Sequence, residues 1–128
     1  MMAFAAEFDP QPMHLDEVAA RATMMDGLCA SGWYACCVLM RMMADAFVLE
    51  SSSMGAPGVD EVKWLLPIRP DDELRLRATV LDVRASKSRP DMGFVRFNFE
   101  LFNAAGQRVM TLTSSLMMGS RDPKRVAP

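Results

Sequence analysis

The spacing of hydrophobic positions changes part-way along the chain. Residues 33–49 carry only two charges, Arg41 and Asp45, which stand four positions apart. In a helix this spacing places both charges on one face. Almost every other direction around the segment is apolar, and a helix of that kind must be wrapped by other structure. We therefore predict a long central helix buried inside a domain.

Beyond residue 50 the period shortens from 3.6 to 2. A loop of small and turn-forming residues (51–58) is followed by alternating apolar and polar positions at 62–66, 74–80 and 95–101. This alternation predicts three strands, and a fourth is expected over about 107–118. Turn residues at 69–72 and 103–106 separate them. Strands joined by such short turns favour an antiparallel sheet.

The segment before the long helix predicts a second, short helix. Asp16 can cap a helix that runs to about Thr23, with Glu17 and Arg21 four residues apart on its surface. The order is then short helix, long apolar helix and four strands. This order predicts an α+β hot-dog fold, in which an antiparallel sheet wraps around a long central helix.

The outward positions of the predicted strands are more apolar than an isolated domain should leave in water. They include Leu65, Phe94, Phe102, Val109 and Met117. A second copy of the chain would cover part of this surface, so we expect a homodimer or a higher homo-oligomer.

Length and charge limit the possibilities further. The chain has 128 residues with 14 basic and 16 acidic side chains, a net charge of −2. This size predicts one domain over residues 1–119, followed by an exposed tail at 120–128. A slightly acidic protein is unsuited to nucleic acid, because phosphate contacts demand a basic excess. No nucleic-acid partner is expected.

The cysteines and the apolar runs bear on location. Cys29, Cys36 and Cys37 lack a CxxC spacing and are interpreted as buried, reduced thiols, which suits the cytoplasm. The first residues lack the pattern of a signal peptide. The longest apolar run, 28–40, is shorter than the roughly 20 residues that span a bilayer. We expect a cytoplasmic protein with no membrane partner.

The densest chemical signal is the segment from Asp9 to His14. It holds an acid and the chain's one histidine, separated by two prolines that stiffen the backbone. A carboxylate and an imidazole form a usable acid–base pair near neutral pH. The alternative is an ordinary solvated turn in front of a helix.

A second candidate lies where the long helix begins, at Ser31 and Gly32. The first turn of a helix presents unpaired N–H groups, and glycine lets a ligand approach them closely. Such a site would suit a developing oxyanion. The alternative is a serine cap beside a glycine that packs on the sheet.

Other constellations carry weaker signals. One histidine and widely spaced cysteines do not predict a zinc site, and no glycine-rich phosphate loop is present. Arg84, Lys87 and Arg89 form a basic turn that would either receive phosphate or be a solvated hairpin tip.

Together these residues resemble the MaoC-like branch of the hot-dog superfamily, which includes the (R)-specific enoyl-CoA hydratases. Residues 4–16 resemble the hydratase motif of that family, an aspartate and a histidine around an amide and a proline. Residues 30–33 match the start of its central helix, where many members carry His-Gly. Residues 62–72 resemble the strand and proline turn that follow.

The resemblance implies a lyase that adds water to a 2-enoyl-CoA and, in reverse, dehydrates a 3-hydroxyacyl-CoA. Asp9 would be the base toward water and His14 its partner in positioning and proton delivery. Gly32 and Ser31 would form the oxyanion and substrate-binding site. CoA would be part of the substrate, so no separate cofactor or metal is expected. The acyl tail is expected along the central helix, near Met40.

The sequence departs from the family pattern in three places. Gln11 replaces an asparagine, a serine of the central helix is replaced near Met40, and the chain begins almost at the motif, so we expect the sheet to be one strand short. These departures keep two alternatives open. One is a non-catalytic acyl-CoA-binding hot-dog module, and the other is a hot-dog thioesterase.

Overall fold

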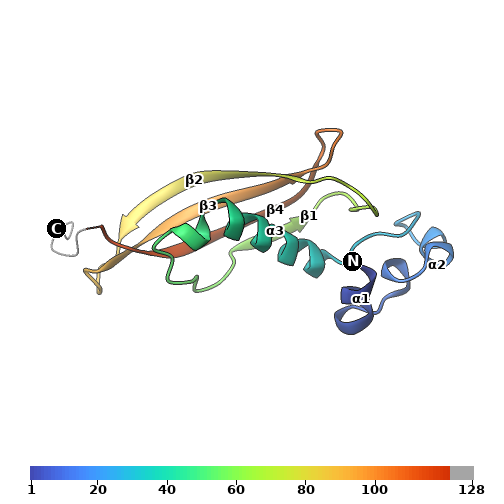
Figure 1. Cartoon of the computed structure of the whole chain (residues 1–128), viewed down its shortest axis with the longest axis horizontal. Helices are drawn as coiled ribbons and strands as arrows, with labels where there is room; N and C mark the ends of the chain where they lie inside the picture. Colours follow the sequence, from blue (N-terminus) through green and yellow to red (C-terminus); the bar gives the residue numbers. More distant parts are fainter. Residues whose placement is uncertain (122–128) are drawn as a thin grey trace.

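A computed structural model describes residues 1–121, and its strands form one antiparallel sheet (Figure 1). The strands are β1 (Glu61–Trp64), β2 (Arg75–Ala85), β3 (Met92–Phe102) and β4 (Arg108–Gly119). Their order across the sheet is β1-β4-β3-β2. The four predicted strands are therefore confirmed, with β2 and β3 longer than the alternating pattern indicated.

One face of the sheet forms the core. Phe97, Phe99 and Leu101 are buried on β3, whereas Arg96, the residue before Phe97, is exposed. The hairpin at 103–106 closes as predicted, because the Gly106 N–H donates to the Asn103 carbonyl and Gly106 adopts a φ of 78°. Positive φ is a conformation that glycine adopts without strain.

Val109 does not point outward as the alternation predicted. Leu101 pairs with Met110 and Phe102 with Arg108, so Val109 is an extra residue between the two pairs. Such a bulge shifts the alternation of the strand that carries it. Val109 is 1% exposed and belongs to the core.

Two apolar residues on the outer face are covered within the chain itself. The Arg84 guanidinium lies 4.1 Å from the centre of the Phe94 ring, and that of Arg77 lies 4.9 Å from the Phe102 ring. Cations over aromatic faces are favourable contacts, and the arginine stems shield the rings from water. The outer face therefore needs less protection by a partner than the sequence indicated.

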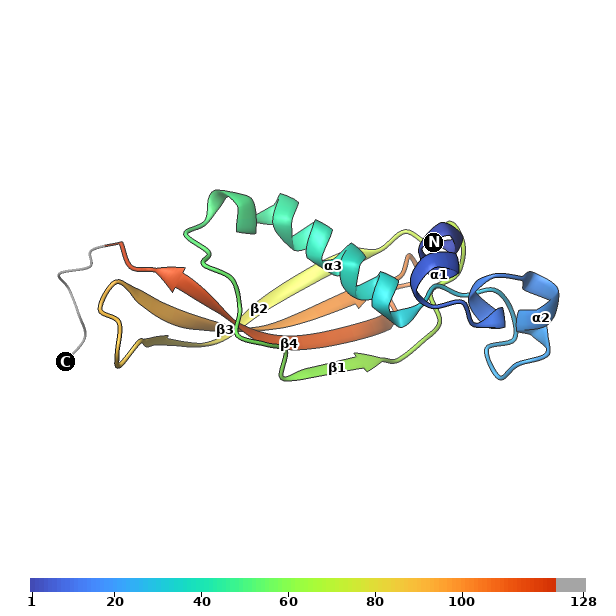
Figure 2. The same ribbon diagram turned by 90° about the horizontal axis from the view of Figure 1, so that it is seen from below.

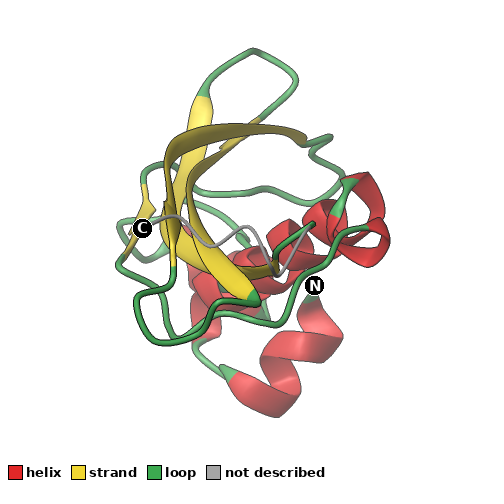
Figure 3. Cartoon of the chain, turned by 90° about the vertical axis from the view of Figure 1, so that its left-hand side faces the viewer, coloured by secondary structure: helices red, strands yellow, loops and turns green. Residues whose placement is uncertain are grey.

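Helix α3 (Gly32–Ala46) packs along the inner face of the sheet (Figure 2). Ala35, Leu39 and Met43 are its buried residues, one helical turn apart, and they join the core of β3 and β4. The end view shows that the sheet is strongly curved and that the helices lie to one side of it (Figure 3). The α+β hot-dog fold is thus confirmed.

The sheet covers one side of α3 and leaves the other open. Trp33 and Met40 are 61% and 47% exposed, and Cys37 is exposed. The helix ends at Ala46 with Phe47 as its C-cap, and a short 3-10 helix, η2 (Val48–Glu50), follows. Arg41 and Asp45 form the expected ion pair at 3.1 Å. Cys29 is buried as predicted and Cys36 is only partly buried, whereas the prediction for Cys37 is wrong because it lies on this open side.

The N-terminal residues gather at one end of the sheet (Figure 2). They form α1 (Met2–Phe8), the 3-10 helix η1 (Pro12–His14) and α2 (Glu17–Arg21). Asp16 caps α2 as predicted, accepting from the Val18 N–H at 3.2 Å. The sequence did not indicate α1, which buries Ala5 alone.

The ends of the described region add two facts. Ser120 and Arg121, the first residues of the predicted tail, are exposed, and the remainder of that tail lies outside the described residues. Among residues 1–121, no helix is both long enough and apolar enough to cross a bilayer.

The core makes a first prediction about stability. Leu39→Ala removes a side chain that is 2% exposed, so we expect it to lower the free energy of unfolding by about 2–5 kcal/mol. Met40→Ala, at the neighbouring and exposed position, should change it by about 0.5 kcal/mol or less. Urea denaturation followed by circular dichroism measures both. Equal losses in the two variants would contradict this packing of α3.

Candidate active site

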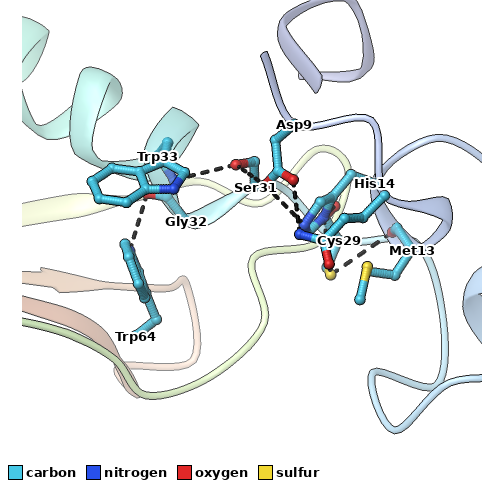
Figure 4. A network of polar contacts seen from close by, with 9 residues as sticks. Asp9, Met13, His14, Cys29, Ser31, Gly32, Trp33 and Trp64 are labelled. Carbon is cyan, nitrogen blue, oxygen red and sulfur yellow. Dashed lines mark hydrogen bonds and ion pairs between the residues drawn. The ribbon is translucent and has the colours of Figure 1, made fainter. Parts of the chain in front are cut away.

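Asp9 and His14 meet at the end of the molecule where α1 joins η1 (Figure 4). Asp9 follows the last residue of α1, and its N–H donates to the Ala5 carbonyl at 2.9 Å. His14 ends η1, which Pro12 begins. The connection brings His14 Nε2 to 3.4 Å from Asp9 Oδ2, with the side chains 10% and 14% exposed. The alternative interpretation, a solvated turn with separate side chains, does not describe this largely buried pair.

His14 is held by the backbone of Cys29. Its Nδ1 lies 2.9 Å from the Cys29 carbonyl oxygen, and the Cys29 N–H donates to the Met13 carbonyl at 3.1 Å. A carbonyl oxygen can only accept, so Nδ1 must carry a proton. Nε2 is then the atom that can take or give a proton, and it faces Asp9.

Asp9 accepts a hydrogen bond at each carboxylate oxygen. The Ser31 hydroxyl donates to Oδ2 at 2.6 Å, and the Gln11 amide donates to Oδ1 at 2.8 Å. The Ser31 bond, the Gln11 bond and the charge of His14 lower the pKa of Asp9, against an opposing effect of partial burial. Each oxygen keeps a second lone pair that can receive a further donor.

Ser31 lies at the junction of this network with α3. Its hydroxyl accepts from the Trp33 N–H at 3.2 Å, which makes it the N-cap of the helix, and donates to Asp9. The side chain is 0% exposed. Ser31 was predicted to bind substrate, but its one hydroxyl proton is donated to Asp9 and it is not among the residues that line the cleft. Ser31 instead positions Asp9.

Gly32 begins α3 beside the indole of Trp64. The Trp64 Nε1–H donates to the Gly32 carbonyl at 3.0 Å, and a Cβ on Gly32 would lie 2.4 Å from the indole ring. As the first residue of the helix, Gly32 has an N–H with no acceptor inside the helix. Glycine is therefore required here for a close approach of the ring.

A cleft of about 400 Å³ opens next to these groups. Asp9, His14 and Gly32 line it together with apolar residues of α3, of β1 and of the β1–β2 connection. These further lining residues include Trp33, Ala35, Trp64, Leu65, Leu66, Pro67 and Ile68. The cleft thus combines a carboxylate, an imidazole and a helix N-terminus at one end of an apolar surface.

Comparison with known proteins identifies the family. Residues 1–94 match the model of the MaoC like domain. The chain belongs to the MaoC-like domain family. A MaoC-like dehydratase from Rhodospirillum rubrum is 40% identical, with a TM-score of 0.86 over 94% of this chain and 82% of that one.

Two more distant relatives extend the comparison of this MaoC-like domain. The uncharacterized protein YdeM of Bacillus subtilis is 27% identical over 103 residues, 80% of this chain and 72% of its own. The R-hydratase PhaJ1 from Pseudomonas aeruginosa is 19% identical, with a TM-score of 0.67 over 94% of this chain and 71% of that one. The second likeness concerns the fold.

Arg69 supports the site of this MaoC-like domain and was missed in the sequence. Its guanidinium donates to the carbonyls of Met25, Gly27 and Leu28 at 2.6, 2.8 and 3.3 Å. These contacts hold the loop before Cys29 against the β1–β2 connection. The sequence marked residues 69–72 as a turn, but nothing in it indicated where the Arg69 side chain would bind.

The predicted basic turn lies elsewhere. Residues 86–91 join β2 to β3 at the end of the sheet opposite α1 (Figure 1). The Ser86 hydroxyl accepts from the Arg89 N–H at 3.1 Å, and the Arg89 guanidinium pairs with Asp91 at 2.6 Å. These internal contacts favour the hairpin-tip interpretation. Within residues 1–121, no three His, Cys, Asp or Glu side chains gather in a manner that could hold a metal.

The network predicts a shift in the titration of Asp9. Ser31→Ala removes the largest cause of its lowered pKa, so we expect that pKa to rise toward 3.8, the ordinary value. In the wild type, ionised Asp9 stabilises the fold at pH values above the ordinary pKa of an aspartate. This stabilisation is lost as the pH falls through the lowered pKa of Asp9. The variant should keep less of this stabilisation.

The measurement is a carbon-13 NMR titration of the Asp9 carboxyl in both proteins. Ser51→Ala is the control, because the Ser51 hydroxyl bonds to the Val48 carbonyl beyond the far end of α3. The control should leave the Asp9 titration in place. An Asp9 curve that is the same with and without Ser31 would refute the assigned cause.

Proposed function

We propose that this MaoC-like domain is a lyase that hydrates a 2-enoyl thioester of CoA and, in reverse, dehydrates the 3-hydroxyacyl thioester. One observation carries the proposal. The Asp9 carboxylate and the His14 imidazole converge at 3.4 Å on an apolar cleft whose lining includes the first residue of α3.

The reaction needs a water held beside the β-carbon of the enoyl group. Asp9 keeps a free lone pair on Oδ2, and His14 Nε2 faces the same oxygen. A water that contacts both atoms from the cleft side donates one hydrogen to Asp9. As its oxygen bonds to the β-carbon, that proton passes to the carboxylate, and an imidazolium at His14 supplies the proton that the α-carbon takes up. The net change is addition of one water across the double bond.

Charge also develops on the thioester oxygen. When the water adds, electrons of the double bond shift toward the carbonyl and create an enolate-like oxyanion. The N–H of Gly32 lies at the positive end of α3 and has no acceptor within the helix. A donor aimed at such an oxygen stabilises the transition state more than the ground state. Gly32 is the group we assign to this role.

The relatives support the reaction class. The Rhodospirillum rubrum protein, called a MaoC-like dehydratase, is 40% identical. The resemblance of the segment from Asp9 to His14 to the hydratase motif points the same way. A thioesterase would require water to attack the carbonyl carbon of the thioester instead of the β-carbon. That alternative has no comparable support from the relatives.

A non-catalytic acyl-CoA-binding module is the second candidate. It is favoured by the lowered pKa of Asp9, which weakens this carboxylate as a base, and by the two donors already bound to its oxygens. An enzyme converts the enoyl-CoA that it binds, whereas a binding module leaves it unchanged, so a turnover measurement separates the two candidates.

Replacing the proposed base tests the reaction. Asp9→Asn keeps the shape of the side chain and removes its charge, so we expect the rate of enoyl-CoA hydration to fall about 10²–10⁴-fold. The rate is followed as the loss of the conjugated thioester absorbance with crotonyl-CoA.

Asp45→Asn is the matched control, because it removes a carboxylate that pairs with Arg41 on the exposed side of α3. It should keep the wild-type rate. If wild type and Asp9→Asn give the same background rate, the enzymatic proposal is wrong. Release of free thiol, detected with a thiol-reactive dye, would indicate a thioesterase instead.

We also propose that the protein acts in the cytoplasm as a homodimer. The support is the apolar exposure of the edge strand β2, where Val80, Leu81 and Val83 are 54%, 49% and 67% exposed. Exposed apolar residues on an unpaired strand edge favour association with another chain.

Light scattering after size exclusion measures the assembly. We expect a mass of twice 14.2 kDa for the wild type. Val80→Lys should shift the protein toward the monomer, because it places a charge on the edge strand. A monomer at all concentrations would exclude the dimer.

A further inference from the structure

The cleft ends at the first turn of α3. Gly32, Trp33 and Ala35 are its lining residues on that helix. One turn further on, Leu39 is 2% exposed and packs in the same core cluster as Phe99, which is 0% exposed. Side chains therefore fill the space between helix and sheet beyond Ala35.

This arrangement corrects the expected path of the acyl chain. Met40 was expected to line a tunnel along the helix, but it lies on the open side of α3, 47% exposed, and is not part of the cleft lining. A closely packed core does not open without a large cost. An acyl group bound beside Asp9 must end near Ala35 or turn toward the mouth of the cleft.

Trp64, the last residue of β1, lines the cleft next to Gly32 (Figure 4). Its Nε1–H donates to the Gly32 carbonyl, and its ring meets the Trp33 ring edge-on at 5.4 Å and 75°. The face of the indole covers the place where a Gly32 Cβ would be. The ring is thus held at three points although it is 48% exposed.

Held in this way, the Trp64 indole forms a wall of the cleft, by which we mean a side chain of fixed position that limits the space for a ligand. Moving it would break the hydrogen bond to Gly32 and the contact with Trp33. Aromatic pairs of this geometry are worth about 0.5–1.5 kcal/mol beyond the area that they bury. A ligand that needs more space must meet this cost, so the indole discriminates by size.

We propose that Trp64 sets the acyl-chain length that the site accepts, so that the substrates are short-chain 2-enoyl thioesters. The inference rests on the proposed function and adds the class of acyl group. Trp64 is a specificity-determining residue because it contacts the acyl chain, whereas Asp9 and His14 act on the double bond.

The first test compares crotonyl-CoA with trans-2-decenoyl-CoA. Each methylene that a pocket excludes is worth about 10-fold or more, so the wild type should favour crotonyl-CoA in kcat/KM by at least about 10-fold. Trp64→Ala should reduce this preference about 10-fold or more by opening the wall. Trp64→Phe should lie between the two, because an aromatic ring remains but the hydrogen bond to the Gly32 carbonyl is lost.

Met40→Ala is the matched control. It shortens an apolar side chain on α3 outside the cleft, so the preference should not change. The inference is overturned if the wild type prefers decenoyl-CoA, if Trp64→Ala keeps the full preference for crotonyl-CoA, or if Met40→Ala is the variant that removes it.

A binding measurement separates this inference from the proposed reaction. Calorimetric titration uses butyryl-CoA and decanoyl-CoA, which have no double bond to hydrate. Tighter binding of butyryl-CoA by the wild type, with the preference lost in Trp64→Ala, supports the wall even if no enoyl thioester is turned over. Equal binding of both ligands by the wild type overturns it.

Folding of the variants is checked by circular dichroism. If Trp64→Ala does not fold, Trp64→Leu replaces it, because leucine fills part of the space and still shortens the wall. The same loss of preference is expected, and an unchanged preference in Trp64→Leu overturns the inference. The proposed function fails separately, through the Asp9→Asn comparison with crotonyl-CoA.

Discussion

The hydrogen bond from the Ser31 hydroxyl to Asp9 is the contact on which the site depends. It joins the N-cap of α3 to the loop after α1, two elements that are 22 residues apart in sequence. The same hydroxyl accepts from the Trp33 N–H, so one side chain both begins the helix and orients the carboxylate. Because Ser31 is fully buried, this bond is shielded from competing water.

The other site groups are fixed by backbone atoms rather than by specialised side chains. The Cys29 carbonyl sets the tautomer of His14, and the Gly32 carbonyl holds the Trp64 indole. Arg69 in turn binds three carbonyls of the loop before Cys29. The segment before α3 therefore positions the site residues. Arg69 of the β1–β2 connection joins this segment to the sheet.

The predictable parts of this protein are those governed by local rules. Strand alternation identified residues 95–101 of β3, because apolar residues alternate there with Arg96, Asn98 and Glu100. The rule failed at Val109, where the register of β3 and β4 adds a residue that no local pattern reveals. The Asp9 and His14 pair was found from residue type and stiff spacing. Trp64 and Arg69 were missed as site residues because their partners are 32 and about 41–44 positions away.

The sequence by itself determined the order of the short helix, the long helix and the four strands, the caps at Asp16 and Ser31, and the presence of an acid and an imidazole on a short proline-containing segment. Helical and strand periods and capping depend on neighbouring residues, and so they can be read along the chain. Tertiary structure alone decided that the Ser31 hydroxyl turns to Asp9, that the cleft stops at Ala35, and that Trp64 covers Gly32. These outcomes depend on how distant segments pack together, and packing is a property of the whole fold.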